Sequence, residues 1–157
     1  MNEDQQSKNV FLIEDDLSLN SSIKDILEFK QYHVKTYTTA NDFLEDFDSN
    51  IAPAVVVSDM MLPGLSGIDL QVKIVENFRK IPIIFISGES TLSQCISAMK
   101  MGALDFLLKP FEFKQLIDAI ERGMDIDKLF MRSIIKRNEL DINLQKLSPR
   151  EQEVFHL

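Results

Sequence analysis

The chain is poor in side chains that cross-link or bind soft metals, with one cysteine, Cys95, and two histidines among 157 residues. A disulfide framework or a Cys/His metal cluster needs several such side chains, so both are excluded. Long apolar runs are also missing, and residues 1–9 lack the apolar core of a signal peptide. We therefore expect a cytoplasmic protein that makes no contact with a membrane.

Excess positive charge is lacking as well. The formal net charge is −8, from 25 acidic and 17 basic residues. Phosphate contacts in nucleic-acid complexes need Lys and Arg, so an acidic chain is a poor non-specific binder of DNA. Any DNA binding is expected to depend on a segment outside this sequence. Apolar residues make up 45%, which is enough for the core of one ordinary domain.

Short apolar runs, rich in β-branched and aromatic residues, recur along the first two thirds of the chain. The clearest are 10–13, 54–57 and 83–86, and weaker ones lie at 33–37 and 104–108. Continuous apolar runs of this length are typical of strands that are buried on both faces of a parallel sheet. The sequence therefore predicts five strands, three of them with the continuous apolar runs of strands that are buried on both faces.

Each predicted strand is followed by apolar residues spaced three or four apart, as in an amphipathic helix. The positions are Leu19, Ile23, Ile26 and Leu27; Phe43, Leu44 and Phe47; Leu65, Ile68, Val72 and Val75; Leu92, Ile96 and Met99; and Phe113, Leu116, Ile117 and Ile120. Gly102 is expected to end the fourth helix. The (βα)5 order predicts an α/β fold, a three-layer, doubly wound parallel sheet with right-handed crossovers.

Polar residues follow the strands, at the sheet edge where doubly wound folds carry their functional crevice. Glu14 and Asp15 follow the first strand, Asp59 the third, Ser87 the fourth and Lys109 the fifth. Crowded carboxylates repel one another, and Mg²⁺ with its preference for oxygen ligands relieves that repulsion. A carboxylate nucleophile, a lysine and a hydroxyl are suited to accepting a phosphoryl group as an acyl phosphate.

Together these motifs resemble the receiver domain of two-component response regulators. The matching segments are VFLIEDD at 10–16, VVVSDMMLPGLSG at 55–67, IIFISG at 83–88 and GALDFLLKPF at 102–111. The resemblance implies a flavodoxin-like receiver domain over residues 9–124, after an N-terminal tail of residues 1–8. It also implies a phosphoprotein of a phosphorelay, which receives its phosphoryl group from a sensor histidine kinase.

The resemblance assigns roles around a magnesium site. Asp59 is the expected phosphoacceptor, and Glu14 and Asp15 form the acidic pocket. Asp15 and Asp59 would bind Mg²⁺ directly, Glu14 would act through water, and the backbone carbonyl of Met61 would complete the protein ligands. The adjacent Asp16 has two interpretations, as a group behind the metal ligands or as the N-cap of the first helix.

The resemblance also implies a switch beside the phosphoacceptor. Ser87 and Lys109 are expected to contact the phosphoryl group, and the bond from Lys109 to Pro110 is expected to be cis. Phe106 occupies the switch position, where many members of the family have tyrosine. The face around the fourth helix and fifth strand would then pair two copies of the chain.

No strand pattern follows Asp125. A heptad-like spacing of 4-3-4-3-4-3 joins Ile126, Phe130, Ser133, Arg137, Leu140, Leu144 and Leu147. It predicts a helix from about 125 to 146 that leaves the domain, so that 125–147 forms a linker. An amphipathic linker and a coiled-coil dimer seam are both consistent with this pattern.

The last residues carry a helix-start signal, with Ser148 as N-cap and Pro149 in the first turn. The octet LSPREQEV at 147–154 resembles the opening of the LuxR-type helix-turn-helix in regulators of the NarL/FixJ class. Residues 148–157 are therefore expected to begin a DNA-binding domain that is mostly absent from this sequence. The expected function is a phosphorylation-activated regulator of transcription, with a homodimer as its active form.

Three alternatives were compared with this hypothesis. A stand-alone receiver would act only by docking on a partner protein. A Mg²⁺-dependent aspartyl phosphatase of the haloacid dehalogenase kind needs Asp-x-Asp, but Met61 replaces the second acid after Asp59. In a flavin-binding domain, Glu14 and Asp15 would repel the flavin phosphate. We therefore expect no enzyme activity beyond slow self-dephosphorylation.

Overall fold

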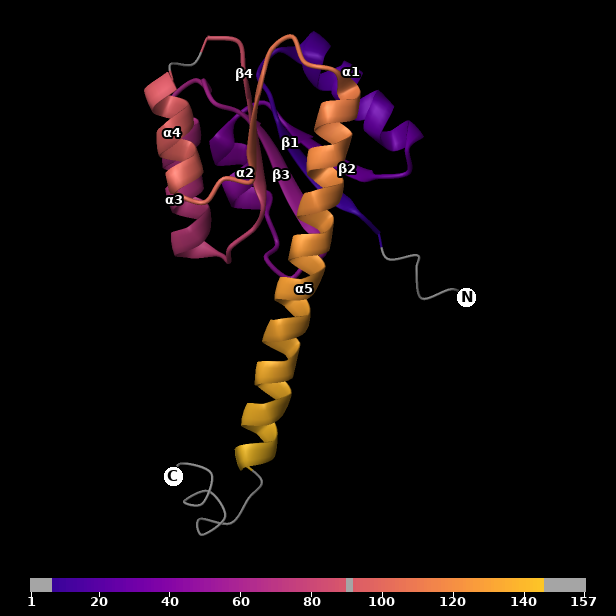
Figure 1. The fold of residues 1–157 in the computed structure, drawn as a ribbon, viewed down its shortest axis with the longest axis vertical. Helices are drawn as coiled ribbons and strands as arrows, with labels where there is room; N and C mark the ends of the chain where they lie inside the picture. Colours follow the sequence, from indigo (N-terminus) through magenta and orange to yellow (C-terminus); the bar gives the residue numbers. More distant parts are fainter. Residues whose placement is uncertain (1–6, 90–91, 146–157) are drawn as a thin grey trace.

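The computed structural model describes residues 7–89 and 92–145, and strands alternate with helices throughout this part of the chain (Figure 1). The elements are β1 (Asn9–Ile13), α1 (Leu17–Phe29), β2 (His33–Tyr37), α2 (Ala40–Asp46), β3 (Ala54–Asp59), α3 (Gly67–Asn77), β4 (Ile83–Ser87), α4 (Leu92–Lys100), β5 (Asp105–Leu108) and α5 (Phe113–Gln145). The predicted (βα)5 order is confirmed.

The strands form one parallel sheet in the order β2-β1-β3-β4-β5. Every residue of β1, β3 and β4 is buried, as their continuous apolar runs predict. Helices α1 and α5 pack on one face of the sheet, and α2, α3 and α4 pack on the other (Figure 1). The predicted three-layer architecture is therefore confirmed, and all carboxyl ends of the strands lie along one edge.

Helix α3 turns a different face to the core than its apolar spacing indicates. Leu70 and Ile74 are buried, whereas Val75 is exposed. The cause is Gly67, where an added Cβ would lie only 2.7 Å from the Phe85 ring. The backbone at Gly67 therefore lies directly against β4, and this contact sets the rotation of the helix about its axis.

Helix α4 also departs from the predicted burial. Leu92, Ile96 and Met99 form the predicted apolar stripe, but they are 76%, 45% and 43% exposed. Ala98 is the buried residue of this helix. The helix ends at Lys100, and Gly102 follows in the predicted C-terminal position, with a φ of +98° that suits a residue without a Cβ. An apolar stripe therefore faces solvent next to β5.

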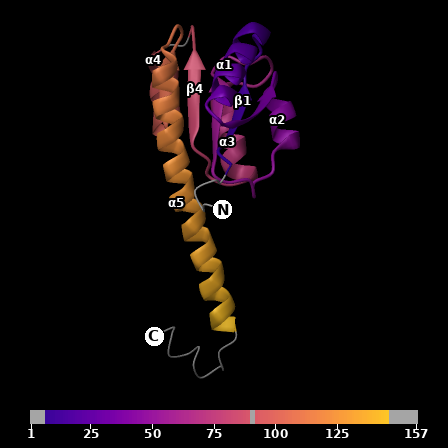
Figure 2. The same ribbon diagram turned by 90° about the vertical axis from the view of Figure 1, so that its right-hand side faces the viewer.

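Helix α5 is continuous over 33 residues, so the last receiver helix and the predicted linker are one element. Its C-terminal half extends beyond the sheet (Figures 1 and 2). Despite this length, none of the helices within the described ranges is apolar enough to cross a lipid bilayer.

A buried ion pair fastens the middle of α5 to the domain. Asp127 is fully buried, and it accepts hydrogen bonds from the Ala54 backbone N–H at 2.7 Å and from Arg79 Nη2 at 2.9 Å. Arg79 also donates to the carbonyls of Ser49 and Ile51. A residue predicted to lie in a linker is thus part of the receiver fold.

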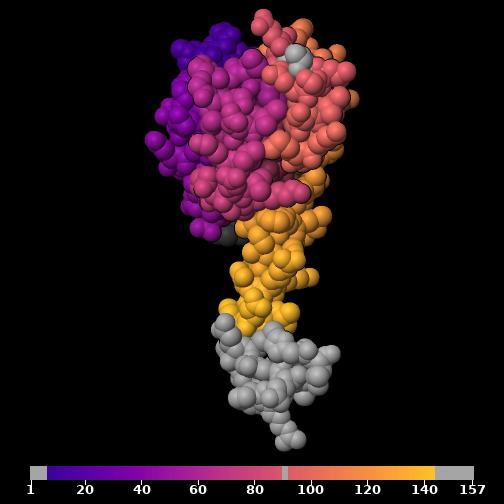
Figure 3. Space-filling view, turned by 90° about the vertical axis from the view of Figure 1, so that its left-hand side faces the viewer, coloured from indigo at the N-terminus to yellow at the C-terminus, as the bar shows by residue number. Residues whose placement is uncertain are grey.

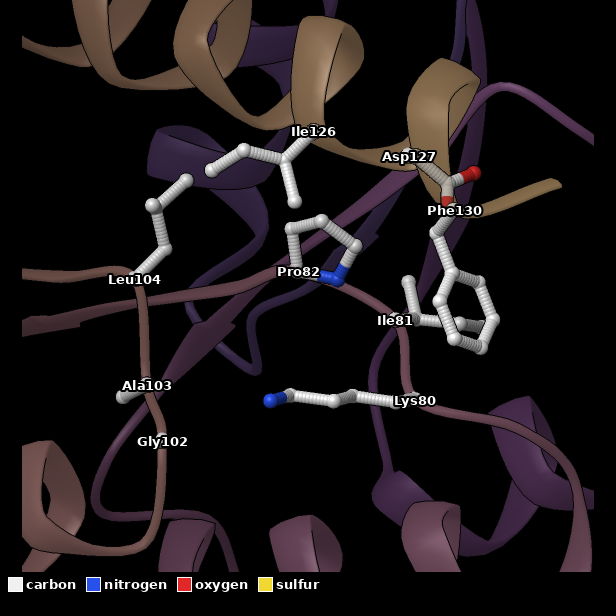
Figure 4. Close-up of a pocket in the computed structure, with 9 residues that line it drawn as sticks. All are labelled: Lys80, Ile81, Pro82, Gly102, Ala103, Leu104, Ile126, Asp127 and Phe130. Atoms are coloured by element: carbon white, nitrogen blue, oxygen red, sulfur yellow. The ribbon is translucent and has the colours of Figure 1, made fainter. Parts of the chain in front are cut away.

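A hollow of about 290 Å³ lies beside this ion pair (Figure 4). Its apolar walls come from Ile81, Pro82, Ala103, Leu104, Ile126 and Phe130. These residues precede β4 and β5 or belong to α5, so the hollow lies at the amino ends of the strands. It is therefore separate from the edge where the predicted site residues follow the strands.

The buried pair leads to a prediction about stability. Arg79→Ala would leave the Asp127 carboxylate buried without a partner, which costs about 3–5 kcal/mol. Urea denaturation measures this loss in the free energy of unfolding. Arg122→Ala is the matched control, because Arg122 pairs with Asp105 at the surface and its side chain is 56% exposed. This control should lose less than about 1 kcal/mol, and equal losses in the two variants would contradict the role of the buried pair.

Candidate functional site

The carboxyl ends of β1 and β3 bring three acidic side chains together. Carboxylate oxygens of Glu14, Asp15 and Asp59 lie within 4.8 Å of one another. Glu14 is fully buried, Asp59 is nearly so, and Asp15 faces solvent. Hard oxygen donors in this number, with one side open to water, suit a hard divalent cation such as Mg²⁺.

Lys109, at the end of β5, connects two of these carboxylates. Its Nζ donates to Asp59 Oδ2 at 3.0 Å and to Glu14 Oε2 at 3.2 Å. The Lys109 backbone N–H donates to the Ser87 carbonyl at 2.8 Å, and the following bond to Pro110 is cis, as predicted. The carboxylates that follow β1 and end β3 therefore meet around the ammonium group that follows β5.

Burial strongly affects the charge of Glu14. Desolvation raises the pKa of its carboxyl to about 7, and the nearby Asp59 charge acts in the same direction. The Asp16 N–H and Lys109 favour the ionised form but do not outweigh burial. Desolvation lowers the pKa of Lys109, but its hydrogen bond to Asp59 and the two carboxylate charges prevail, so that pKa is raised.

The loop after β3 wraps around the Asp59 carboxylate. Asp59 Oδ1 accepts a hydrogen bond from the Met61 backbone N–H at 3.0 Å. The Met60 backbone N–H donates to the Ile86 carbonyl, and the Met60 side chain is buried. The backbone of Met61 is therefore held next to the acidic side chains, while its own side chain is half exposed.

Asp16 is the N-cap of α1. Its Oδ1 accepts hydrogen bonds from the backbone N–H groups of Ser18 at 3.0 Å and Leu19 at 3.2 Å. Its own N–H donates to Glu14 Oε1 at 3.1 Å. Of the two interpretations of this residue, the structure supports the helix cap.

The two predicted switch residues lie on neighbouring strands. Ser87 is fully buried at the end of β4, beside the Lys109 backbone. Phe106 is half-buried on β5, with its ring centroid 6.4 Å from that of Phe85. Ser87 thus lies at the end of β4, and Phe106 lies on β5, the strand that Lys109 follows. The roles of both residues in switching stay predictions.

The profile of the response regulator receiver domain matches residues 10–121. The chain belongs to this family. Nodulation protein W of Bradyrhizobium diazoefficiens is 34% identical over 94% of this chain, and FixJ of Rhizobium meliloti, a transcriptional regulatory protein, is 32% identical over 93%. The chain spans 65% of the length of nodulation protein W and 71% of FixJ.

A solved structure shows the same receiver fold. The response regulator StyR superposes with a TM-score of 0.88 and 33% sequence identity, over 96% of this chain and 76% of that chain. The predicted resemblance to two-component response regulators of the FixJ type is thus confirmed.

Sequence reasoning missed one polar residue that supports the receiver site. Asn20 on α1 is buried, and its Nδ2 donates to the Glu14 carbonyl at 3.0 Å and the Tyr37 carbonyl at 3.3 Å. These two hydrogen bonds connect the carboxyl ends of β1 and β2 next to the acidic side chains. A signal was present, because Asn20 stands three residues before Ile23 and seven before Leu27, on the buried stripe of the helix.

The raised pKa of Glu14 predicts how receiver stability depends on pH without divalent cations. The fold holds the Glu14 proton more tightly than the unfolded chain does. Stability should therefore fall as pH rises from 4.5 to about 7, and then level off. The expected loss is about 3 kcal/mol. Glu14→Gln cannot ionise, so in chelator the variant should be more stable than the natural protein at pH 8, with a smaller difference at pH 5.

Urea denaturation across this pH range measures the difference. Glu28→Gln, which changes an exposed carboxylate on α1, should retain the natural pH dependence. The same slope of stability against pH in Glu14→Gln and the natural protein would show that Glu14 does not carry the effect.

Proposed function

We propose that this receiver is a phosphorylation-activated switch that accepts a phosphoryl group on Asp59 from a sensor histidine kinase. The observation that carries the proposal is the buried Asp59 carboxylate, which lies among acidic oxygens and is ion-paired to Lys109. Glu14 shares both the carboxylate cluster and the lysine pair, but it is fully buried, whereas Asp59 keeps a slight exposure to solvent and also accepts a hydrogen bond from the Met61 backbone N–H.

The chemistry is a transfer between two nucleophiles. An Asp59 oxygen forms a bond to phosphorus as the P–N bond of the donor phosphohistidine breaks, and the imidazole keeps that electron pair and takes up a proton. Asp15, Asp59 and the Met61 carbonyl would hold Mg²⁺ directly, and Glu14 would do so through water. The bound cation supplies positive charge against the phosphoryl oxygens.

Phosphorylation changes the charge balance that Lys109 maintains. The phosphoryl group adds negative charge and acceptor oxygens to Asp59, and Lys109 Nζ would move from the carboxylates to one of these oxygens. We propose that the Ser87 hydroxyl donates to another of these oxygens. The side chain of Phe106 on β5 would then turn inward towards Ser87. Ser87 is the last residue of β4, at the site edge of the sheet, and Phe106 is the second residue of β5, where it pairs with Phe85.

The proposed receiver is a switch and not a turnover enzyme. Met61 stands where a phosphatase of the haloacid dehalogenase kind would need its acid/base, and its half-exposed side chain has no proton to transfer. Water can attack the acyl phosphate only slowly without such a group. We therefore expect self-dephosphorylation as the sole reaction that follows transfer.

The output face would be the apolar stripe of α4 together with β5. Leu92, Ile96 and Met99 on α4 are joined by Leu108, which is 62% exposed. Apolar side chains grouped in this way favour contact with another protein surface. We propose that phosphorylation makes this face bind its counterpart on a second copy of the chain. The C-terminal half of α5, where the seam residues Ile126 and Leu140 are exposed, is the alternative interface.

We propose that the dimer regulates transcription through a C-terminal DNA-binding domain. The support is the similarity to FixJ, a transcriptional regulatory protein of which this chain covers 71%. In this scheme 9–124 is the receiver and 125–147 the linker, which is joined to the receiver fold through the buried Asp127. Residues 148–157, which lie outside the described residues, begin the output domain. A cytoplasmic location follows from the proposed exchange with a kinase and with DNA.

Asp59→Asn tests the phosphoacceptor, because an amide cannot form the acyl phosphate. Size-exclusion chromatography with Mg²⁺ and acetyl phosphate should show a dimer for the natural chain and a monomer for this variant. Asp25→Asn, an exposed position on α1, is the matched control and should dimerise normally. Dimerisation of Asp59→Asn to the same extent as the natural chain would reject the proposal.

Ile96→Glu tests the output face. It should weaken phosphorylation-dependent dimerisation at least tenfold, since it places a charge at the centre of the apolar stripe, at a cost of about 1.4 kcal/mol or more. Val75→Glu is the control, because Val75 is an aliphatic residue on α3 that is 56% exposed, compared with 45% for Ile96. Both variants should still accept a phosphoryl group, as measured by mass spectrometry. Normal dimerisation of Ile96→Glu would show that the dimer interface does not include the apolar stripe of α4.

A further inference from the structure

Residues 128–138, the first part of the exposed half of α5, differ in charge from the rest of the chain, and the acidic Glu139 and Asp141 follow them. Residues 128–138 contain four basic side chains and no acidic one, although the chain as a whole carries a net charge of −8. The helix at this point stands clear of the globular domain (Figure 3). The basic residues are Lys128, Arg132, Lys136 and Arg137.

Three of these cations surround one hollow. The hollow measures about 490 Å³ and is lined by Leu129, Arg132, Ser133, Lys136, Arg137 and Leu140. Ser133, the smallest of them, lies between the two leucines along the helix, with the cations on either side. Within the described residues, none of the three cations forms an ion pair with a carboxylate. The surface therefore offers three unneutralised charges and a hydroxyl.

We propose that this surface binds the phosphate backbone of duplex DNA, next to the site contacted by the output domain. The inference rests on the proposed function in transcription, and it adds a contact to the one expected of that domain. Arg132 and Arg137 are five residues apart, which is about 7.5 Å along the helix axis. Phosphates of one DNA strand advance by about 3.4 Å along the duplex axis, so these side chains can reach separate phosphates.

Charge complementarity favours DNA over a second copy of the chain at this surface. In a parallel pair of α5 helices, Arg137 lies on the predicted seam and would face the same residue of the other copy. Two such cations repel each other, whereas a line of phosphates neutralises them. Contacts to phosphate do not distinguish bases, so this surface would add affinity and orientation but no sequence preference.

The salt dependence of binding provides the test. Fluorescence anisotropy of a labelled duplex of about 25 base pairs, titrated with the whole chain at about 20 to 200 mM KCl, gives the slope of log K against log salt. Three or four phosphate contacts predict a slope of about −3 to −4. The variant R132Q/K136Q/R137Q should lose most of the affinity, with a slope nearer to about −1.

The control variant K24Q/K30Q/K35Q removes the same charge from α1, its C-cap and β2, and should bind like the natural chain. Two duplexes of unrelated sequence should give equal affinities. Absence of binding in low salt, equal slopes for the two triple variants, or binding to anionic vesicles but not to duplex would each overturn the proposal. Circular dichroism checks that the helix of each variant is intact.

Acetyl phosphate labelling of Asp59 in the same variants separates this inference from the proposed function. Labelling should be unaffected by R132Q/K136Q/R137Q, because these residues lie on the part of α5 that extends beyond the sheet, away from the carboxyl ends of the strands (Figure 1). A chain that takes up phosphate but shows equal salt slopes would retain the proposed function and lose the DNA surface. A chain that shows the predicted salt slopes but no labelling would retain the DNA surface and lose the proposed phosphoacceptor function.

Discussion

The Lys109 ammonium is the interaction on which the signalling edge of this receiver depends. It bridges two carboxylates that come from β1 and β3, while its own backbone is attached to β4. Without a cation between them, Glu14 and Asp59 would repel each other in a buried setting, where charges are poorly screened. Burial has already moved Glu14 towards its neutral form. The repulsion between the two carboxylates at this edge is thus offset mainly by Lys109. A new negative charge on Asp59 would therefore change the contacts that the lysine makes.

Much of this arrangement could be predicted from the sequence, since it depends on local patterns. Continuous apolar runs indicate buried parallel strands, and the rule that such strands end at one edge brings Asp59 and Lys109 together. The rest depends on contacts between distant residues that have no periodic signature. The pairing of Arg79 with Asp127 joins positions 48 residues apart, and the rotation of α3 depends on the fit of Gly67 against Phe85. Spacing alone cannot reveal either one.

Average properties conceal local ones in two places. Apolar spacing in α4 predicts a core helix, but the stripe faces solvent because the small Ala98 suffices to pack the opposite side. In the same way, the net charge of −8 argues against DNA contact, whereas the outer part of α5 is a basic segment. The basic segment lies on the part of α5 beyond the sheet, away from the phosphoacceptor, whereas the stripe of α4 borders β5, whose end carries Lys109.

The unbroken α5 gives the molecule a mechanical property. The last buried anchor is Asp127, and the helix continues to Gln145. This leaves a stiff arm of about 27 Å beyond the pivot at 1.5 Å per residue. A tilt of about 10° at the anchor would displace the tip by about 5 Å, comparable to one helical turn. Rearrangements of a few tenths of an ångström in the packing beneath Asp127 would therefore be amplified at the far end of the arm.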